Sequence, residues 1–360
     1  MEQNNIQLSV VDVEQKYSYD ITENVYGGGG IVSWGADNDV VKLLYNCYTK
    51  SATLKAAIDQ SLNYILGEGV EISDDAASWR EKVNRRGTTM GALISHIASD
   101  LYIYGNFAIQ VIYNKLGTPV ELYPLDVARC RLNADKNKVY YSKKMWTKYQ
   151  TKADEYDRFG YADFNIDNPT QIYFYNGNGI RCAYALSPWS AALDDVLCEI
   201  EGSRYSLNSI TNGFAARYII NMPDTANLTD EQKKVIEDGI RNKFCGPDAP
   251  NNFMLYYSND ESKNISVQKI EADETPDRFI AMRKNSRENI FTSLRISPLL
   301  CGLSSDTNTG FSTQEFSDSF KLFDKTVAGP VRETLESAVN RIIGVEDGVK
   351  IMPFVLTFED

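Results

Sequence analysis

One abrupt change of hydrophobic period constrains the fold more than any other feature of this sequence. Apolar residues within 88–104 recur every three or four positions, which is the spacing of one helix face. Directly afterwards Phe107, Ile109 and Val111 alternate with other residues, "NKLG" forms a turn, and "PVELYPL" returns as a second strand. A helix that leads directly into a β-hairpin predicts a mixed α+β protein.

Further periodic segments extend this prediction along the chain. Helical spacing is expected over 37–66, from an N-cap at Ser187 with Pro188 in the first turn, over 229–245, over 276–296, and from Ser312 with a kink at Gly329-Pro330. Strands are expected in "KVYYSKKMW", "QIYFYN", "FMLYY", "ISVQKI" and the C-terminal "GVKIMPFVLTFED". The acidic stretch 151–170 is interpreted as a loop or edge insertion because it is polar and rich in turn residues.

Composition excludes several classes of protein. A hydrophobic fraction of 43% permits a sizeable core, and a net charge of -12 argues against a protein coated with nucleic acid, although DNA could still pass through it. No signal peptide or membrane-spanning run is expected. The six cysteines form no C-x-x-C pair, which is typical of free thiols in a reducing cytoplasm.

The run Gly27–Gly30 is predicted to be a flexible joint between an N-terminal arm and the body of the protein. A phosphate-binding loop is the alternative. That alternative requires G-x-x-x-x-G-K-[ST], and no Gly-Lys-Ser/Thr follows the glycines.

No catalytic constellation is evident. The single histidine, His96, lies beside the apolar stripe of its predicted helix, without a motif around it. Asp195 and Glu199 share a helix face and could hold a divalent cation, but solvated helix charges are the simpler interpretation. We therefore expect no catalytic residue, no metal site and no cofactor. The residues alone indicate an intracellular α+β protein that acts by assembly.

Two segments in the C-terminal third of the sequence each have a structural and a functional interpretation. The stretch "GLSSDTNTGFSTQE" is an ordinary surface loop, a nucleotide-binding loop or a loop held in a special environment, and its lack of a lysine argues against the second. Its Ser312-x-x-Glu315 pattern predicts where the next helix begins. The helix at 276–296 is basic in an acidic chain, which indicates either a solvated face with salt bridges or a surface facing phosphates.

The order of several local motifs resembles the portal proteins of tailed bacteriophages, of the compact type found in long-tailed phages and related prophages. The matching pieces are "CYTKSATLKAAIDQSLNYILGEGV", "DLYIYGNFAIQVIYNKLGTPVELYPLD", "YALSPWSAALDDV", "LTDEQ" and "SLRISPLLCG". Ala185 stands where many members have glycine, and Ser297 replaces the first of two prolines. The resemblance covers roughly residues 40–345, and the order of its motifs is more specific than any one of them.

The resemblance implies a portal fold with a wing, stem helices, a small clip and a tunnel loop, and with an absent or minimal crown. It implies an N-terminal arm with a glycine-rich joint at 1–35, a wing at 36–228, a first stem helix at 229–246, a clip at 247–271, a second stem helix at 272–298, a stem-end turn and tunnel loop at 299–311, and a wing return helix with C-terminal strands at 312–360.

The resemblance also implies a function and its partners. The chain would form a ring, usually of twelve subunits, at one capsid vertex of the virion after assembly in the bacterial cytoplasm. Double-stranded DNA would pass through the ring, while the large terminase, a head–tail adaptor and the major capsid protein would dock on it. Another ring-forming or scaffold protein without a DNA role, and a metal- or nucleotide-dependent enzyme, are the alternatives.

Three groups of residues follow as candidate sites from the resemblance. The tunnel loop would comprise Ser304, Ser305, Asp306, Thr307, Asn308 and Thr309, with Asp306 supplying an acidic ring that repels phosphate. The channel side of the second stem helix would carry Arg278, Arg283, Lys284 and Arg287. The clip would present Asn251, Asn252, Phe253, Tyr256, Tyr257, Asn259 and Asp260 to the terminase or adaptor.

Overall fold

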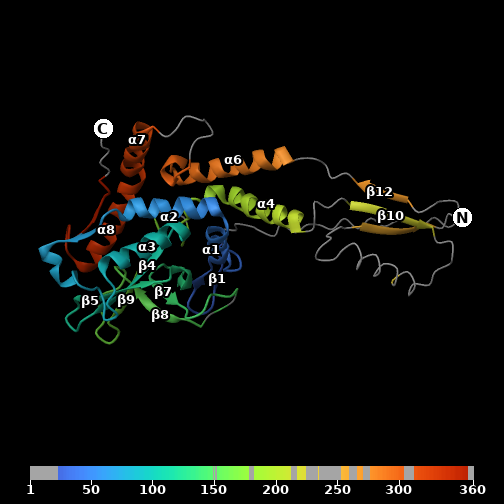
Figure 1. The fold of residues 1–360 in the computed structure, drawn as a ribbon. Helices are drawn as coiled ribbons and strands as arrows, with labels where there is room; N and C mark the ends of the chain where they lie inside the picture. The colour runs from blue at the N-terminus through green and yellow to red at the C-terminus, as the bar shows by residue number, and fades with distance from the viewer. Residues whose placement is uncertain are drawn as a thin grey trace. The chain divides into compact units, whose positions relative to one another are not determined.

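The chain divides into two compact units, which are described separately. Unit 1 comprises Met1–Leu193 and Phe291–Asp360, and unit 2 comprises Asp194–Ile290. The computed structural model describes residues 23–148, 150, 152–177, 182–211, 217–223, 234, 253–258, 266–270, 276–303 and 312–355 (Figure 1).

Unit 1 begins with a small antiparallel hairpin in place of the expected flexible joint. Strands β1 (Val25–Tyr26) and β2 (Ile31–Val32) pair, and the four glycines between them form the turn, closed by a 3.2 Å hydrogen bond from Gly30 N to Gly27 O. Ile31 and Val32 are buried, so the hairpin packs on the body of unit 1. The glycines therefore supply the left-handed backbone that a tight turn requires, because φ is positive at both ends of the run.

Three helices follow where two were expected. The predicted helix over 37–66 is divided into α1 (Val40–Lys50) and α2 (Ala52–Leu66). Ser51 has an extended backbone, and its hydroxyl accepts a 3.0 Å hydrogen bond from Leu54 N, so it caps the second helix. Prediction and structure agree on α3 (Met90–Tyr104).

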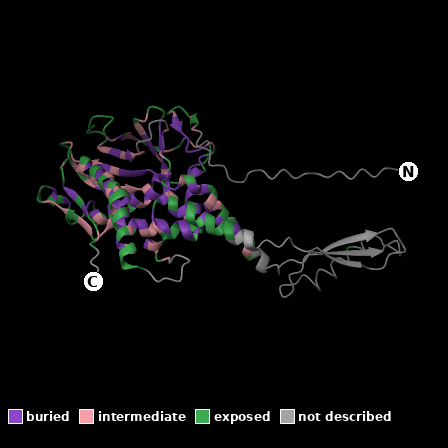
Figure 2. Cartoon of the chain, turned by 90° about the horizontal axis from the view of Figure 1, so that it is seen from above, coloured by how far each residue is buried: buried purple, intermediate pink, exposed green. Residues whose placement is uncertain are grey.

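A sheet with strand order β5-β4-β9-β8-β7-β6 forms the other layer of unit 1. The predicted hairpin is confirmed as β4 (Phe107–Tyr113) and β5 (Pro119–Leu125), paired antiparallel. Helix α3 packs on these two strands and on α2, and the buried side chains gather between helices and sheet (Figures 1 and 2). The remaining strands are β6 (Cys130–Leu132), β7 (Lys138–Tyr141), β8 (Asp154–Arg158) and β9 (Thr170–Tyr175).

Strand β8 corrects the prediction of a loop or edge insertion at 151–170. It lies inside the sheet, antiparallel to β7 and parallel to β9. Arg158 is buried and donates hydrogen bonds to the carbonyl oxygens of Lys136 (3.1 Å) and Phe174 (2.8 Å). The polar composition of the strand conceals its position, because its buried polar side chain is satisfied by backbone groups of neighbouring segments.

The C-terminal part of unit 1 returns to the helical layer. Helix α7 (Thr313–Phe323) continues through a π-turn (η5, Asp324–Ala328) into α8 (Gly329–Ile343). The irregularity lies at the predicted kink, because Pro330 has no N–H group to donate within the helix. Of the expected C-terminal strands, β13 (Val349–Met352) pairs antiparallel with β3 (Gly69–Ile72), and residues 356–360 lie outside the described part.

Unit 2 contains helices and a small sheet. Its described elements are α4 (Leu193–Thr211), β10 (Arg217–Pro223), β11 (Phe253–Ser258), β12 (Ser266–Ile270) and α6 (Pro276–Leu294). The strands expected from "FMLYY" and "ISVQKI" are confirmed, but β10 was not predicted and lies between them, parallel to β11 and antiparallel to β12. The predicted first stem helix, 229–246, lies outside the described residues except for residue 234.

The start of α4 differs from the prediction. A 3₁₀ turn, Ser190–Ala192, precedes the helix, and Ser190 N donates to Ser187 O at 3.0 Å. The hydroxyl of Ser187 is buried and has no hydrogen-bond partner among the described residues, so this residue is not the side-chain cap that the sequence suggested. The α-helix begins later than predicted, because a short 3₁₀ turn follows Pro188 first.

Candidate functional site

The two flanks of the predicted tunnel loop have definite backbone geometry, while Ser304–Thr309 lie outside the described residues. Before them, the 3₁₀ turn η4 (Pro298–Cys301) is capped by Ser297 and closed by Gly302, whose φ is 77°. After them, the hydroxyl of Ser312 accepts a 3.4 Å hydrogen bond from Glu315 N, which confirms the predicted start of α7. Both boundaries of the intervening segment are therefore set by local capping.

Tyr64 of α2 contacts both flanks. Its hydroxyl donates a 3.0 Å hydrogen bond to Leu300 O in η4. Its ring lies edge-on to Phe320 (5.3 Å between centroids) and Phe323 (5.9 Å) in α7. Only 7% of Tyr64 is exposed, and this burial raises the pKa of its hydroxyl. Sequence reasoning missed this residue, since nothing local indicates a bond to a carbonyl more than 200 positions away.

The basic residues of α6 are partly described. Arg283, Lys284 and Arg287 are exposed, and the side chain of Arg278 lies outside the described part. Positions 283 and 287 share a helix face with Ser286 and Ile290, which are buried. The two arginines are therefore exposed neighbours of the buried positions on this side of α6.

The predicted clip residues fall on and around β11. Phe253, Tyr256 and Tyr257 lie in this strand, and β11 is an edge strand of the sheet β11-β10-β12 among the described residues. An edge strand presents backbone N–H and C=O groups that a further strand can pair with. The other predicted clip residues, Asn251, Asn252, Asn259 and Asp260, lie outside the described part.

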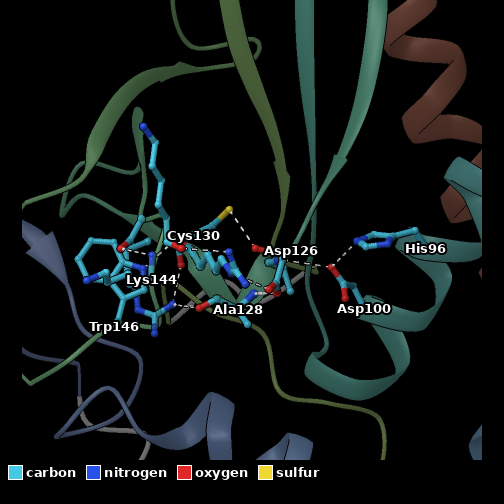
Figure 3. Close-up of polar contacts among 12 residues, drawn as sticks. His96, Asp100, Asp126, Ala128, Cys130, Lys144 and Trp146 are labelled. Atoms are coloured by element: carbon cyan, nitrogen blue, oxygen red, sulfur yellow. Dashed lines mark hydrogen bonds and ion pairs between the residues drawn. The ribbon is translucent and has the colours of Figure 1, made fainter. Parts of the chain in front are cut away.

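His96 and Asp100, one turn apart on α3, point toward each other (Figure 3). Their closest nitrogen and oxygen are 3.7 Å apart, which is longer than a hydrogen bond. Asp100 is buried, and its carboxylate accepts a 3.2 Å hydrogen bond from Val127 N, so it ties α3 to the 3₁₀ turn η2 (Val127–Arg129). Burial raises the pKa of Asp100 well above its ordinary value. This arrangement is a structural tie between a helix and a turn.

We expect Asp100→Asn to stabilise the protein increasingly as the pH rises. A raised pKa in the folded state means that folding favours the protonated acid, so the contribution of Asp100 to stability is complete below its ordinary pKa of 3.8 and is lost as the pH rises through the raised value. Asparagine does not titrate and still accepts from Val127 N. The stability advantage of the variant over the wild type, measured by urea unfolding, should grow as the pH rises from 4 to 8.

Asp126→Asn serves as the control for this prediction. Asp126 lies in the same region, but its side chain is 40% exposed and pairs with Arg129 at 3.0 Å. Its replacement removes a nearby negative charge that contributes less than burial to the raised pKa of Asp100, so its gain with pH should be smaller than that of Asp100→Asn. If both variants respond alike, burial of Asp100 is not the cause.

The remaining candidates for chemistry are not assembled into a site. Asp195 Oδ1 accepts a 3.1 Å hydrogen bond from Asn289 Nδ2, and Glu199 is buried. Within the described ranges, no group of three or more histidine, cysteine, aspartate or glutamate residues lies close enough to hold a metal ion. Over the same ranges, no helix is both long and apolar enough to cross a membrane. The described cysteines are free thiols, and burial raises the pKa of Cys130 and makes its thiolate unfavourable.

Comparison with known proteins decides the family. A family model described as "Phage portal protein" matches residues 61–353, which is well over half of the chain. The chain belongs to the phage portal protein family. This is a structural, non-enzymatic family, and its members form the connector at a capsid vertex through which DNA passes.

Solved structures support the portal fold. An HK97 family phage portal protein from Corynebacterium diphtheriae matches with a TM-score of 0.56 and 13% identity, over 86% of this chain and 95% of that one. A chain of the virion of a native gene transfer agent particle matches with a TM-score of 0.55 and 14% identity, over 88% and 83%. A chain of the neck of a native gene transfer agent particle, computed with C12 symmetry, has a TM-score of 0.55 and 15% identity, over 91% and 86%. No curated protein matches the chain.

The family assignment confirms the predicted α+β portal fold and the expectation of a protein without enzymatic activity. It leaves the predicted domain boundaries and site residues as predictions. The alternatives of an unrelated scaffold or of a nucleotide-dependent enzyme are set aside by the match over residues 61–353.

Proposed function

We propose that this portal protein assembles into a ring of twelve subunits at one vertex of the virion. The observation that carries the proposal is the family match over residues 61–353, and a similar chain belongs to a particle neck computed with C12 symmetry. The ring requires heterologous contacts, which close when the rotation between neighbouring subunits fits. Double-stranded DNA enters through the ring during packaging and leaves through it during ejection.

Ser304–Thr309 line the channel in this proposal. Two observations support the assignment, namely the capped turn η4 before the segment and the Ser312-capped start of α7 after it. The segment is short and polar, and Asp306 places one carboxylate per subunit near the passing phosphates. An acidic ring repels phosphate and so favours sliding over binding, because each neutralised phosphate would instead add affinity.

The basic residues of α6 have two candidate roles. Arg278, Arg283, Lys284 and Arg287 face the channel in the portal arrangement that we propose. The alternative is that the exposed side chains of Arg283 and Arg287, next to the buried Ser286 and Ile290, meet acidic residues of the neighbouring subunit.

Docking of other proteins completes the proposal. The edge strand β11 and the residues around it receive the large terminase during packaging and a head–tail adaptor afterwards, with backbone pairing as one available mode. The major capsid protein surrounds the ring. ATP hydrolysis belongs to the terminase, which agrees with the lack of a Gly-Lys-Ser/Thr motif after the glycine run here.

Replacement of residues 304–309 by a shorter Gly-Ser linker tests the channel assignment. Rings seen by negative-stain imaging should remain, because in this proposal the segment acts on DNA and not on the contacts between subunits. The amount of DNA retained in assembled particles should fall well below that of the wild type.

A linker of the original length and the same net charge, with its order of residues changed, is the control and should retain more DNA. Loss of rings in the shortened variant would show that the segment is a packing element. A uniform monomer in the wild type, with measurable nucleotide turnover, would contradict the proposed function itself.

A further inference from the structure

In addition to Tyr64, a second buried residue anchors the helices next to residues 304–309. Arg332 of α8 is only 7% exposed, and its guanidinium donates to Ile65 O at 2.9 Å and to Tyr64 O at 3.0 Å. These are carbonyls of the last turn of α2, which have no partner within that helix. Arg332 therefore fixes the end of the helix that carries Tyr64.

The same arginine holds the first residue of the π-turn. Arg332 Nη2 forms an ion pair with Asp324, where α7 passes into η5. One side chain thus contacts the end of α2 and the junction that sets how α7 continues into α8. Arg332 is buried while Asp324 is partly exposed, so the guanidinium is the group that needs compensation, and the two carbonyls provide it. These contacts fix the position of the side chain that joins the two segments.

The π-turn itself has two local causes. Gly329 N donates to Asp324 O across five residues, and a Cβ atom at Gly329 would lie 3.2 Å from that oxygen. Pro330 cannot donate to the preceding turn. A π-turn contains one residue more than an α-turn. A shift of this extra residue would rotate α7 relative to α8 by about 100°, the rotation per residue of an α-helix. The ion pair between Arg332 and Asp324 selects one register.

We propose that Tyr64 and Arg332 are positioning residues that couple η4 to α7 and hold both flanks of residues 304–309 in one arrangement. Tyr64 supplies the direct link through its hydroxyl and its ring. Arg332 orients Tyr64 through the backbone and fixes the π-turn. The coupling follows from contacts between described residues alone. Its consequence for DNA rests on the proposed channel function.

Tyr64→Phe is the sharpest test, because it removes the hydrogen bond to Leu300 O and retains the ring that packs on α7. Hydrogen exchange of assembled rings should show faster exchange in peptides covering 291–303 and 313–328 together, by about fivefold, as expected for the loss of one hydrogen bond. Ring formation should be unchanged. DNA retention in particles should fall in the same direction as in the variant with the shortened 304–309 segment.

Tyr48→Phe is the matched control. The hydroxyl of Tyr48 in α1 donates a 2.6 Å hydrogen bond to Asp59 Oδ1 in α2. The same chemical change is therefore made at a site away from η4 and α7. Exchange in the two flanking peptides should not change.

Asp324→Asn is the second test variant and should accelerate exchange in 313–328 together with 291–303, since it weakens the ion pair that fixes the π-turn.

The outcomes separate this inference from the proposed function. Acceleration of only one flank in Tyr64→Phe, or of neither, overturns the coupling. Unchanged DNA retention in Tyr64→Phe, with reduced retention in the shortened variant, overturns the positioning role. Coupled acceleration with unchanged retention in both variants supports the coupling and contradicts the channel assignment.

Discussion

Gly67→Ala is expected to lower the free energy of unfolding by about 3–5 kcal/mol, which combines the cost of a left-handed residue with that of overpacking. A Cβ atom at this position would lie 1.9 Å from Met352 O, and φ is 54°. The same carbonyl oxygen accepts a 2.9 Å hydrogen bond from Glu68 N, next to the pairing of β3 with β13. The backbone must therefore move, and the closing contact between α2 and the C-terminal strand should be lost.

Gly87→Ala is the matched control for this substitution. Its φ is 79°, which is also positive, but among the described residues nothing lies within 4 Å of the added Cβ atom. The loss should be about 1–2 kcal/mol, from the left-handed conformation alone. Urea unfolding followed by circular dichroism gives both values. Equal losses would mean that the close approach of Gly67 to Met352 is not required for stability.

Arg131→Ala is expected to cost about 3–5 kcal/mol, because it leaves buried carbonyl oxygens without this donor and opens a cavity in the core. Arg131 is 1% exposed, and its guanidinium donates to Asn38 Oδ1 (2.8 Å), Ala128 O (3.0 Å) and Cys130 O (2.7 Å). It lies over the rings of Trp34 and Trp146, at 5.5 and 5.3 Å from their centroids.

The consequence of this change should reach the N-terminal hairpin. Burial lowers the pKa of Arg131, and among the described residues no carboxylate forms an ion pair with it, so the two indole faces and the oxygen acceptors carry the interaction. Figure 3 labels Trp146, Ala128 and Cys130, which supply one of these rings and two of these acceptors. Truncation removes three hydrogen bonds, of which the acceptor Asn38 Oδ1 keeps a second donor in Trp34 N, and it leaves a cavity between two rings. It should expose residues 23–38 to proteolysis.

Arg129→Ala separates this effect from the loss of any arginine in the same strand region. Its side chain is 38% exposed, pairs with Asp126 at 3.0 Å and donates to Lys143 O at 3.1 Å. An exposed pair of this kind contributes less than about 1 kcal/mol. If both variants unfold at the same urea concentration, Arg131 is not an anchor of the N-terminal segment.

Much of the local structure could be predicted because its signals are local. The hairpin after α3 follows from a change of period within one window, and the start of α7 follows from Ser312 and Glu315 three positions apart. The break at Ser51 has the same kind of signal, a serine cap, but it lies inside a continuous apolar pattern that favours one helix. Period alone therefore does not reveal a break between two helices with similar buried faces.

Strands β8 and β10 show where local reasoning fails. The sequence of β8 is acidic, and its place inside the sheet depends on pairing with β7 and β9 and on backbone acceptors for Arg158. Strand β10 directly follows a long helix in the sequence, and only its pairing with β11 and β12 identifies it as central. Strand pairing is long-range, so a polar or isolated segment carries little indication of it.

The sequence by itself determined the α+β class, most of the helices and strands, the caps that bracket residues 304–309, and the portal family through the order of its motifs. The tertiary structure alone decided that Tyr64, Arg131 and Arg332 are anchors. The reason is physical. Caps and periods act within a few residues of one chain segment, whereas a buried hydroxyl or guanidinium acquires its role from distant carbonyls and rings that folding brings to it.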